Sequence, residues 1–274
     1  MMRRAQPWLG TLVDITTESQ AASEAVTAAF ADIARVHRLM SFHDPDSDVT
    51  RFNRAAVGQC IEVDPHTWTV LQLAAQVADA SDGCFNLACA AQLVEWGYLP
   101  AATAPASPPP FVPGVRAFEL DTIGRVRKTA NAWIDLGGIA KGYAVDLAIG
   151  ALQLHGVDSA CVNAGGDMRV FGASAWPVSV RAADQPGAIG AQLMLRNAAV
   201  ATSAHYFAAR RTAAGSMVSA LIDGRSGQPV LARRSVSVRA ASCAVADALT
   251  KVVMASGDAA HPCLEKFGAA AFII

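Results

Sequence analysis

The sequence predicts an α+β protein with a mixed β-sheet flanked by helices. Short apolar runs of strand length recur along the chain, and segments with apolar residues at helical spacing lie between several of them. The chain has 274 residues and is 53% hydrophobic, which is enough to bury a large core. We therefore expect residues 1–274 to form a single domain.

Each element is expected from its local pattern. Apolar residues at helical spacing predict helices at Ala21–Leu39, Trp68–Ala80, Ala140–Leu154 and Cys243–Met254. Apolar runs bounded by turn residues predict strands at Leu12–Thr16, Ala117–Leu120, Ala132–Leu136, Ser159–Val162, Val178–Arg181, Ala191–Leu195, Ala199–Thr202 and Ser235–Arg239. Six prolines fall within residues 100–114, so an exposed loop is expected there.

Composition excludes several classes of function. A net charge of −1 and a pI of about 6.6 give no basic surface for nucleic acid. No apolar run reaches the roughly 20 residues of a membrane-spanning helix. No apolar segment follows Arg3 and Arg4, so we expect no signal peptide and a cytoplasmic location, or a periplasmic one if a leader was removed. The six cysteines lack the paired spacing of metal sites and are expected to be reduced thiols.

Residues 135–146 form the most informative stretch, because three glycines, a lysine and two carboxylates follow a strand-like run. Glycines let backbone N–H groups approach an anion closely, and a helix that begins near Ile139 would direct its positive end toward it. Lys141 adds a formal charge. This composition is typical of a turn that binds phosphate.

A second glycine turn, at residues 163–169, follows another apolar run. Two such turns suggest that one nucleotide lies between them. Neither turn matches the P-loop, because Lys141-Gly142 is followed by Tyr143, and neither has the G-x-G-x-x-G spacing of dinucleotide-binding turns. The composition indicates phosphate binding, but the spacing of the residues matches neither of these two known motifs.

The order of motifs resembles that of the ApbE-type flavin transferases, the FAD:protein FMN transferases, over about Leu9 to Ala255. The matching segments are Leu9-Gly10-Thr11, Met40-Ser41 through Ser47 to Arg51-Phe52-Asn53, Gly83-Cys84-Phe85-Asn86 with Trp96-Gly97, residues 135–146, residues 163–169, Ala201-Thr202-Ser203, residues 222–229 and Ala246-Asp247-Ala248-Leu249. The resemblance implies an ApbE-like, T-fold-related architecture. It also implies that a metal-dependent enzyme cleaves FAD and attaches FMN to a threonine or serine of an acceptor flavoprotein, releasing AMP.

The resemblance also implies a set of site residues. Those expected to bind FAD are Leu9, His43, Asn53, Cys84, Phe85, Asn86, Asp135, Gly137, Lys141, Asn163, Gly165, Gly166, Asp167, Thr202 and Ser203. Those expected to act in catalysis are Asp247 and Lys141, together with His205 as a replacement for a family histidine that this chain lacks. Those expected to hold Mg²⁺ are the carbonyl of Gly138, Asp247 and Thr250. Hard oxygen ligands of this kind suit Mg²⁺.

The chain departs from the family pattern at the metal site. In that pattern a threonine falls four residues after the aspartate, whereas this chain has Thr250 three residues after Asp247 and Lys251 at the fourth position. Residues three and four apart share one face of a helix. Thr250 could still reach the ion, or the ammonium of Lys251 could supply part of its charge.

Three further departures concern the flavin pocket and the proton of the acceptor hydroxyl. Ala220 stands where the family has a histidine suited to act as a general base. His205 or His43 could replace it, Asp247 with the metal could activate the hydroxyl, or transfer could be slow. His43 occupies the place of a tyrosine expected to pack on the isoalloxazine ring, and Asn86 replaces an aspartate.

These departures leave two alternatives to the transferase. If acceptor use has been lost, the chain would be an FAD pyrophosphatase that releases FMN and AMP. If Lys251 has displaced the metal altogether, it would be a non-catalytic FAD-binding protein. Magnesium-dependent release of AMP separates the enzymes from the binding protein, and covalent flavin on an acceptor separates the two enzymes.

Overall fold

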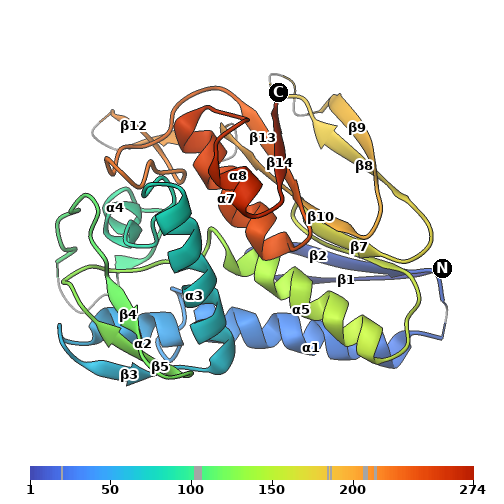
Figure 1. Ribbon diagram of the computed structural model, residues 1–274, viewed down its shortest axis with the longest axis horizontal. Helices are drawn as coiled ribbons and strands as arrows, with labels where there is room; N and C mark the ends of the chain where they lie inside the picture. Colours follow the sequence, from blue (N-terminus) through green and yellow to red (C-terminus); the bar gives the residue numbers. More distant parts are fainter. Residues whose placement is uncertain (20, 102–106, 184, 186, 206–208, 213–214) are drawn as a thin grey trace.

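The computed structural model describes residues 1–274 except 20, 102–106, 184, 186, 206–208 and 213–214. Its centre is a seven-stranded sheet (Figure 1). In spatial order the strands are β1 (Met2–Trp8), β2 (Thr11–Thr17), β6 (Ala160–Ala164), β7 (Asp167–Phe171), β10 (Ala198–Ala204), β13 (Ser235–Ala240) and β14 (Ala270–Ile273). Every neighbouring pair is antiparallel. The α+β class with flanking helices is confirmed, but the sheet is antiparallel rather than mixed in direction.

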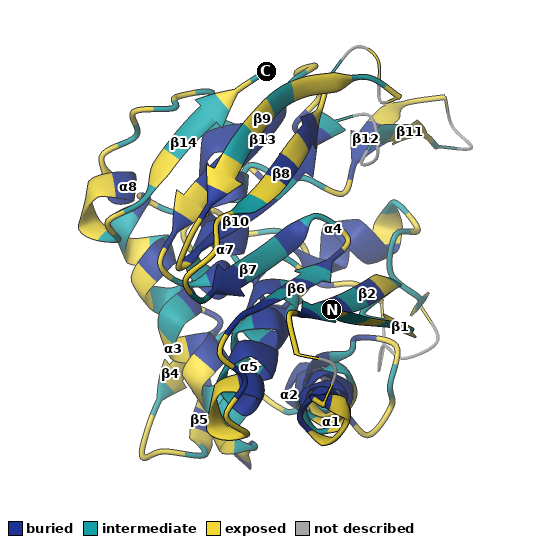
Figure 2. Cartoon of the chain, turned by 90° about the vertical axis from the view of Figure 1, so that its right-hand side faces the viewer, coloured by how far each residue is buried: buried dark blue, intermediate teal, exposed yellow. Residues whose placement is uncertain are grey.

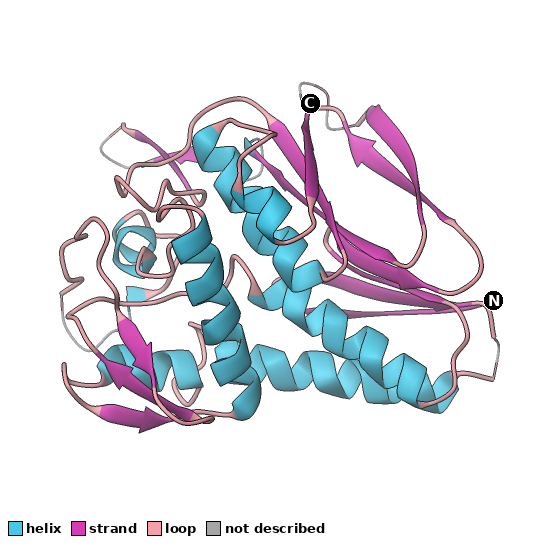
Figure 3. Ribbon diagram, in the orientation of Figure 1, coloured by secondary structure: helices cyan, strands magenta, loops and turns pink. Residues whose placement is uncertain are grey.

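Three long helices cover one face of this sheet, as Figure 3 shows. They are α1 (Ser23–Met40), α5 (Ala140–Leu154) and α7 (Cys243–Ser256). The alternation of strand side chains directs Val13, Ile15, Val236 and Val238 toward these helices, where all four are fully buried. The helices pack on one another as well, α5 lying between α1 and α7.

The opposite face carries a smaller layer. The hairpin of β8 (Trp176–Arg181) and β9 (Ile189–Leu195) packs Val178 and Leu195 against Val170 and Val200 of the sheet. Val200 points away from the long helices because its neighbours Ala199 and Ala201 point toward them. The sheet therefore separates a large core from a small one.

Most of the remaining elements lie beside the long helices, at the left of Figure 1. The helices are α2 (Asp48–Arg54), α3 (Pro65–Ala80), α4 (Ala90–Glu95) and α8 (Cys263–Lys266). The strands are β3 (Cys60–Glu62), β5 (Arg125–Lys128) and β4 (Phe118–Leu120) in one sheet, with β11 (Ala209–Arg211) and β12 (Met217–Ser219) as a hairpin. The buried carboxylate of Asp48 accepts bonds from Thr67 Oγ1 at 2.6 Å and the Asp64 N–H at 2.9 Å, which ties α2 to α3.

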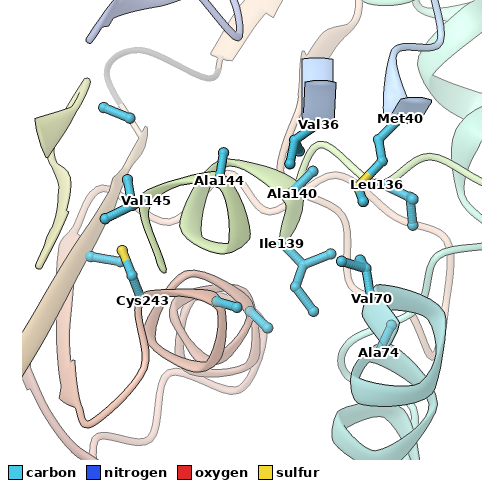
Figure 4. Close-up of a cluster of buried hydrophobic side chains, with 14 of the residues drawn as sticks. Val36, Met40, Val70, Ala74, Leu136, Ile139, Ala140, Ala144, Val145 and Cys243 are labelled. Carbon is cyan, nitrogen blue, oxygen red and sulfur yellow. The ribbon is translucent and has the colours of Figure 1, made fainter. Parts of the chain in front are cut away.

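The start of α5 lies where several helices meet (Figure 4). Ile139 is fully buried beside Val36 of α1 and Val70 of α3. Figure 2 shows both buried and exposed faces on α1 and α5, as expected for helices that lie on a sheet. Packing of this kind fixes the backbone just before α5, which carries Asp135, Gly137 and Gly138.

One predicted strand is wrong. Residues 132–134 and Leu136 are buried and Asp135 is half-buried, but this run pairs with no other strand in the part of the chain that the structure describes. Instead the side chain of Asn53 accepts from Ile134 N–H at 2.8 Å and donates to Ile134 C=O at 2.9 Å, and Asp135 N–H donates to Leu87 C=O at 3.1 Å. A side-chain amide satisfies the backbone in place of a strand, which an apolar run cannot reveal.

The other predicted helices and strands are confirmed, with ends shifted by a few residues. Sequence reasoning missed β1, whose Arg3, Arg4 and Gln6 obscure an edge strand, and also β14 and the short elements α2, α4, α8, β3, β5, β7, β11 and β12. The proline-rich segment has no helix or strand over residues 107–114, and residues 102–106 lie outside the described part. None of the helices that the structure describes is both long and apolar enough to span a bilayer.

Candidate functional site

Two adjoining cavities meet at the loop before α5. The smaller, of about 230 Å³, is lined by Leu9, Met40 and His43 among others. The larger, of about 500 Å³, is lined by Phe85, Asn86 and residues of β10. Asp135, Gly137 and Lys141 line both cavities, as does Leu99. The glycine turn found in the sequence therefore forms the junction of the two cavities.

Four charged side chains converge at this junction. The carboxylate of Asp247, on α7, is fully buried; its Oδ2 lies 3.5 Å from Lys141 Nζ and accepts the Gly142 N–H at 3.2 Å, while its Oδ1 is paired with Lys251 Nζ. Asp167 Oδ2, on β7, lies 2.9 Å from Lys141 Nζ. Two carboxylates thus face two ammonium groups in one cluster.

Close approach of α5 to α7 makes this cluster possible. A Cβ on Gly142 would lie 2.3 Å from the carbonyl oxygen of Cys243, so only glycine fits there. The same residue donates its N–H to Asp247, and its neighbour Lys141 reaches the same carboxylate. The local sequence Lys141-Gly142 therefore supplies both the space for α7 and two of the contacts of Asp247.

Pairing decides the protonation states within the cluster. Burial disfavours a charged Lys141, but the carboxylates of Asp167 and Asp247 outweigh it and raise the pKa of the ammonium above its usual value. Burial raises the pKa of the Asp167 carboxyl, and the negative charge of Asp247 adds to the rise. Burial acts on Asp247 in the same sense, but Lys141 and Lys251 hold the pKa of its carboxyl below the usual value. Lys141 and Asp247 are therefore an ion pair at neutral pH.

Asp146 of α5 anchors the start of α7. Its carboxylate accepts from Ser242 Oγ at 2.7 Å and from the backbone N–H groups of Cys243 and Ala244, each at 2.9 Å. It also pairs with Arg169 at 2.7 Å. A carboxylate at a helix N-terminus satisfies donors that the helix leaves unpaired. Asp146 lies within the first glycine turn of the sequence, but its anchoring role depends on a contact 97 residues away and has no local signal.

We expect Asp146→Asn to lower the free energy of unfolding by about 1–3 kcal/mol, because the hydrogen bonds that the charged carboxylate accepts are lost or weakened. Urea denaturation of the variant and the wild type measures this difference. Asp121→Asn, the same chemical change at an exposed turn, is the matched control. Equal loss in both variants would contradict the anchoring role of Asp146.

Most of the predicted FAD-binding residues lie at the cavities. The smaller cavity has Leu9 and His43, the larger has Cys84, Phe85, Asn86, Thr202 and Ser203, and Asp135, Gly137 and Lys141 line both. Gly138 also lines the larger cavity. Sequence reasoning missed Leu99, which lies three residues after the Trp96-Gly97 motif, and Tyr98, Leu221 and Ile222 beside the larger cavity.

Other predicted residues line neither cavity. Asn53 is buried and holds Ile134 by its side chain. Asn163, Gly165 and Gly166 form the turn of the β6–β7 hairpin, where Asn163 Oδ1 accepts from Gly166 N–H at 2.9 Å. Asp167 and Asp247 lie behind Lys141.

Two predicted catalytic or metal-binding residues also lie away from the cavities. Thr250 is fully buried, donates to the Asp247 carbonyl oxygen at 2.7 Å and shares a hydrogen bond with Ser203 Oγ at 2.7 Å. His205 follows β10 and lines neither cavity, and its buried Nδ1 has no hydrogen-bond partner among the described residues. His43 is exposed at the smaller cavity, and Ala220 is exposed at the larger.

Comparison with known proteins agrees with this geometry. An FAD:protein FMN transferase of Rhodobacter capsulatus is 30% identical over 270 residues, which cover 92% of this chain but 51% of the relative. Another from Vibrio cholerae is 26% identical over 242 residues, which cover 82% of this chain and 71% of the relative. The chain thus spans about half the length of the Rhodobacter relative.

The fold is shared along the whole chain. The crystal structure of the ApbE protein of Thermotoga maritima, 26% identical, matches with a TM-score of 0.85 and covers 100% of this chain and 94% of that one. The model of the ApbE family matches residues 9–273, so the segments that form the two cavities, the turn before α5 and the Asp247 helix all lie inside the match. The chain belongs to the ApbE family.

Proposed function

We propose that this protein transfers FMN from FAD to a serine or threonine hydroxyl of an acceptor protein and releases AMP. The observation that carries the proposal is the position of Lys141 at the junction of two cavities, with the N-terminus of α5 beside it. A pyrophosphate linking two bulky groups requires such a junction. The names of the related transferases support the same activity.

The two cavities suit the two halves of FAD. The smaller cavity has a mainly apolar lining, with Leu9, Met40 and His43, and would take the isoalloxazine ring. The larger cavity, with Phe85 and Asn86, would take the adenosine half. The pyrophosphate then lies at Lys141 and the N-terminus of α5, where an ammonium and the helix dipole favour negative charge. The Gly137 N–H beside them is bonded to Asp135 Oδ2 at 3.0 Å.

The proposed reaction is a displacement at phosphorus. The hydroxyl oxygen of the acceptor bonds to the phosphorus of the FMN half, the bond from that phosphorus to the bridging oxygen breaks, and AMP leaves with the bridging oxygen. The hydroxyl proton is released in the same step. Lys141 would stabilise charge on the phosphate oxygens, and the paired carboxylates Asp167 and Asp247 would hold its ammonium in place.

The Mg²⁺ implied by the resemblance does not fit the donors as they stand. Both oxygens of Asp247 are in contact with ammonium groups, and the Thr250 hydroxyl is bonded to the Asp247 carbonyl and Ser203. Among the described residues, no group of three or more His, Cys, Asp and Glu side chains could hold a metal ion. Mg²⁺ requires close octahedral coordination by oxygen. No step of the proposed reaction depends on it.

The remaining proposals follow from the same geometry. The core cluster that includes both Val13 and Leu264 supports a single domain over residues 1–274. Asn53 and Asn163 would support the site through the backbone rather than contact FAD. The partner would be a flavoprotein that presents its serine or threonine at the cavity junction.

Incubation of the purified protein with FAD and a peptide that carries one threonine tests the proposal. The products to be measured are AMP, free FMN and the peptide mass, with a threonine-to-valine peptide as control. AMP together with a peptide heavier by one FMN less one water supports the transferase. AMP with free FMN alone would establish the pyrophosphatase instead, and intact bound FAD with every peptide would reject both enzymes.

We expect Ala220→His to raise the rate of transfer to the peptide. Ala220 is exposed at the larger cavity, so an imidazole there can face the acceptor hydroxyl. A positioned general base contributes roughly 100-fold or more to a rate. The gain should appear in single-turnover transfer and follow a single ionisation near neutral pH. Ala182→His, at the residue directly after β8, which lines neither cavity, is the control. Equal rates in both variants would contradict this role.

A further inference from the structure

We propose that the ammonium of Lys251 is the resident cation of this site, so that FAD is bound and cleaved without a divalent metal ion. The inference rests on the proposed function for its cleavage step. Its observations are the position of one side chain, the charge of the cluster and the orientation of Thr250.

Lys251 lies where the ion was expected. It follows Asp247 by one helical turn, and its Nζ is paired with Asp247 Oδ1. Its Cε lies 3.5 Å from the point where a Cβ on Gly138 would be, so the side chain runs between Asp247 and Gly138. These two residues were two of the three expected metal ligands. The lysine occupies the space between them.

The charges of the cluster balance without a metal. Asp167 and Asp247 supply two negative charges, and Lys141 and Lys251 supply two positive charges within salt-bridge distance. A divalent cation placed at Asp247 would lie beside both ammonium groups and be repelled by them. For it to bind, Lys251 would have to leave its carboxylate partner.

The two ammonium groups of the cluster face the cavity and their two carboxylate partners lie behind them, while Asp135, outside the cluster, also lines the cavity. The side chains of Lys141 and Lys251 are 28% and 18% exposed, and both line the larger cavity, whereas those of Asp167 and Asp247 are 5% and 0% exposed. A bound pyrophosphate would therefore meet two ammonium groups that already have fixed positions. Charge-assisted hydrogen bonds of this kind are the strong ones.

Thr250 does not replace the metal ligand that is lost because position 251 is a lysine. Thr250 is fully buried, and its hydroxyl is directed to the Asp247 carbonyl and to Ser203 rather than to the cavity. Of the three expected ligand groups, then, one is turned away and another, the Asp247 carboxylate, is occupied by ammonium partners. The Gly138 carbonyl alone would not hold Mg²⁺.

The test compares the wild type with Lys251→Thr, Lys251→Met and the control Lys266→Thr, which makes the same replacement at an exposed site on α8. Binding of Mn²⁺ alone is followed by electron paramagnetic resonance. FAD affinity is measured by calorimetry in EDTA and in excess Mg²⁺, and AMP release in the presence of the threonine peptide is measured under both conditions.

For the wild type and Lys266→Thr we expect no stoichiometric Mn²⁺ binding and the same FAD affinity and AMP release in EDTA as in Mg²⁺. Lys251→Thr should bind FAD at least about tenfold more weakly in EDTA, because a charged partner is lost, and should gain Mn²⁺ binding and recover affinity in Mg²⁺. Lys251→Met, which offers no oxygen, should lose affinity under both conditions, so the inference does not depend on one variant folding.

Stoichiometric Mn²⁺ binding by the wild type, or AMP release by the wild type only in Mg²⁺, would overturn the inference and leave the proposed function standing. If the wild type binds FAD but releases no AMP under either condition, the proposed function fails. The Mn²⁺ titration still decides in that case whether Lys251 is the resident cation.

Discussion

Asp247→Asn is expected to abolish FAD turnover and to lower the free energy of unfolding by about 3 kcal/mol, because removing one partner of a buried ion pair leaves the others uncompensated. Lys251 would keep no carboxylate partner in the cluster, and Lys141 would keep only Asp167. Both ammonium groups would then be free to shift from the cavity junction. AMP release and urea denaturation measure the two effects separately.

The matched control for this variant is Asp121→Asn, which makes the same chemical change at an exposed turn. Surface changes of this kind are usually within about 0.5 kcal/mol of neutral. If Asp247→Asn were as active and as stable as Asp121→Asn, the cluster would have no part in either property.

The effect of Asp247→Asn on stability should depend on pH. The pKa of Asp247 is held below its usual value of 3.8, chiefly because Lys141 and Lys251 outweigh the effect of burial. A carboxyl with a lowered pKa in the folded state contributes stability above its unfolded pKa and loses it as the pH falls through the folded value. The difference between wild type and variant should therefore be full at neutral pH and narrow below about pH 3.8. Denaturation curves over this range measure it, and a difference that widens in acid would contradict the assigned direction.

Gly142→Ala is expected to be the most disruptive small substitution, lowering the free energy of unfolding by about 3 kcal/mol and reducing FAD turnover. The new Cβ would lie 2.3 Å from the Cys243 carbonyl oxygen and 2.7 Å from the Ala244 nitrogen, which are backbone atoms of α7 and its start. Relief requires α7 to move away from α5. That movement would carry Asp247 away from the Gly142 N–H and from Lys141.

Gly150→Ala provides the control within the same helix. A Cβ there would have no heavy atom within 4 Å, so no packing changes. Alanine is favoured over glycine in a helix interior by roughly 0.5–1 kcal/mol, and the variant should be more stable than the wild type by about that amount. Urea denaturation and AMP release apply to both variants. We expect Gly142→Ala to be less stable than the wild type and Gly150→Ala to be more stable. If both variants were destabilised to the same extent, the loss would reflect a general intolerance of α5 to substitution and not the close approach of Gly142 to α7.

Much of the fold could be predicted because its signal is local. The helices α1, α5 and α7 have apolar residues at helical spacing along lengths of 14 to 18 residues, and their ends were found within a few residues. The run at residues 132–136 was misread because its pattern is the same in a strand and in a buried segment. A strand and a buried segment differ in the group that bonds to their backbone. Here that group is the side chain of Asn53, which is 81 residues away in the sequence.

The same distinction between local and long-range contacts applies to the site. The sequence by itself determined the glycine turn at Gly137 and Gly138, the lysine that follows it, and the one-turn spacing from Asp247 to Lys251, since these depend only on neighbours along the chain. Only the tertiary structure decided that Lys141 pairs with both Asp167 and Asp247, and that Lys251 lies between Asp247 and Gly138. Those contacts join β7, α5 and α7, whose relative positions are set by the packing of buried side chains and by the absence of a side chain at Gly142.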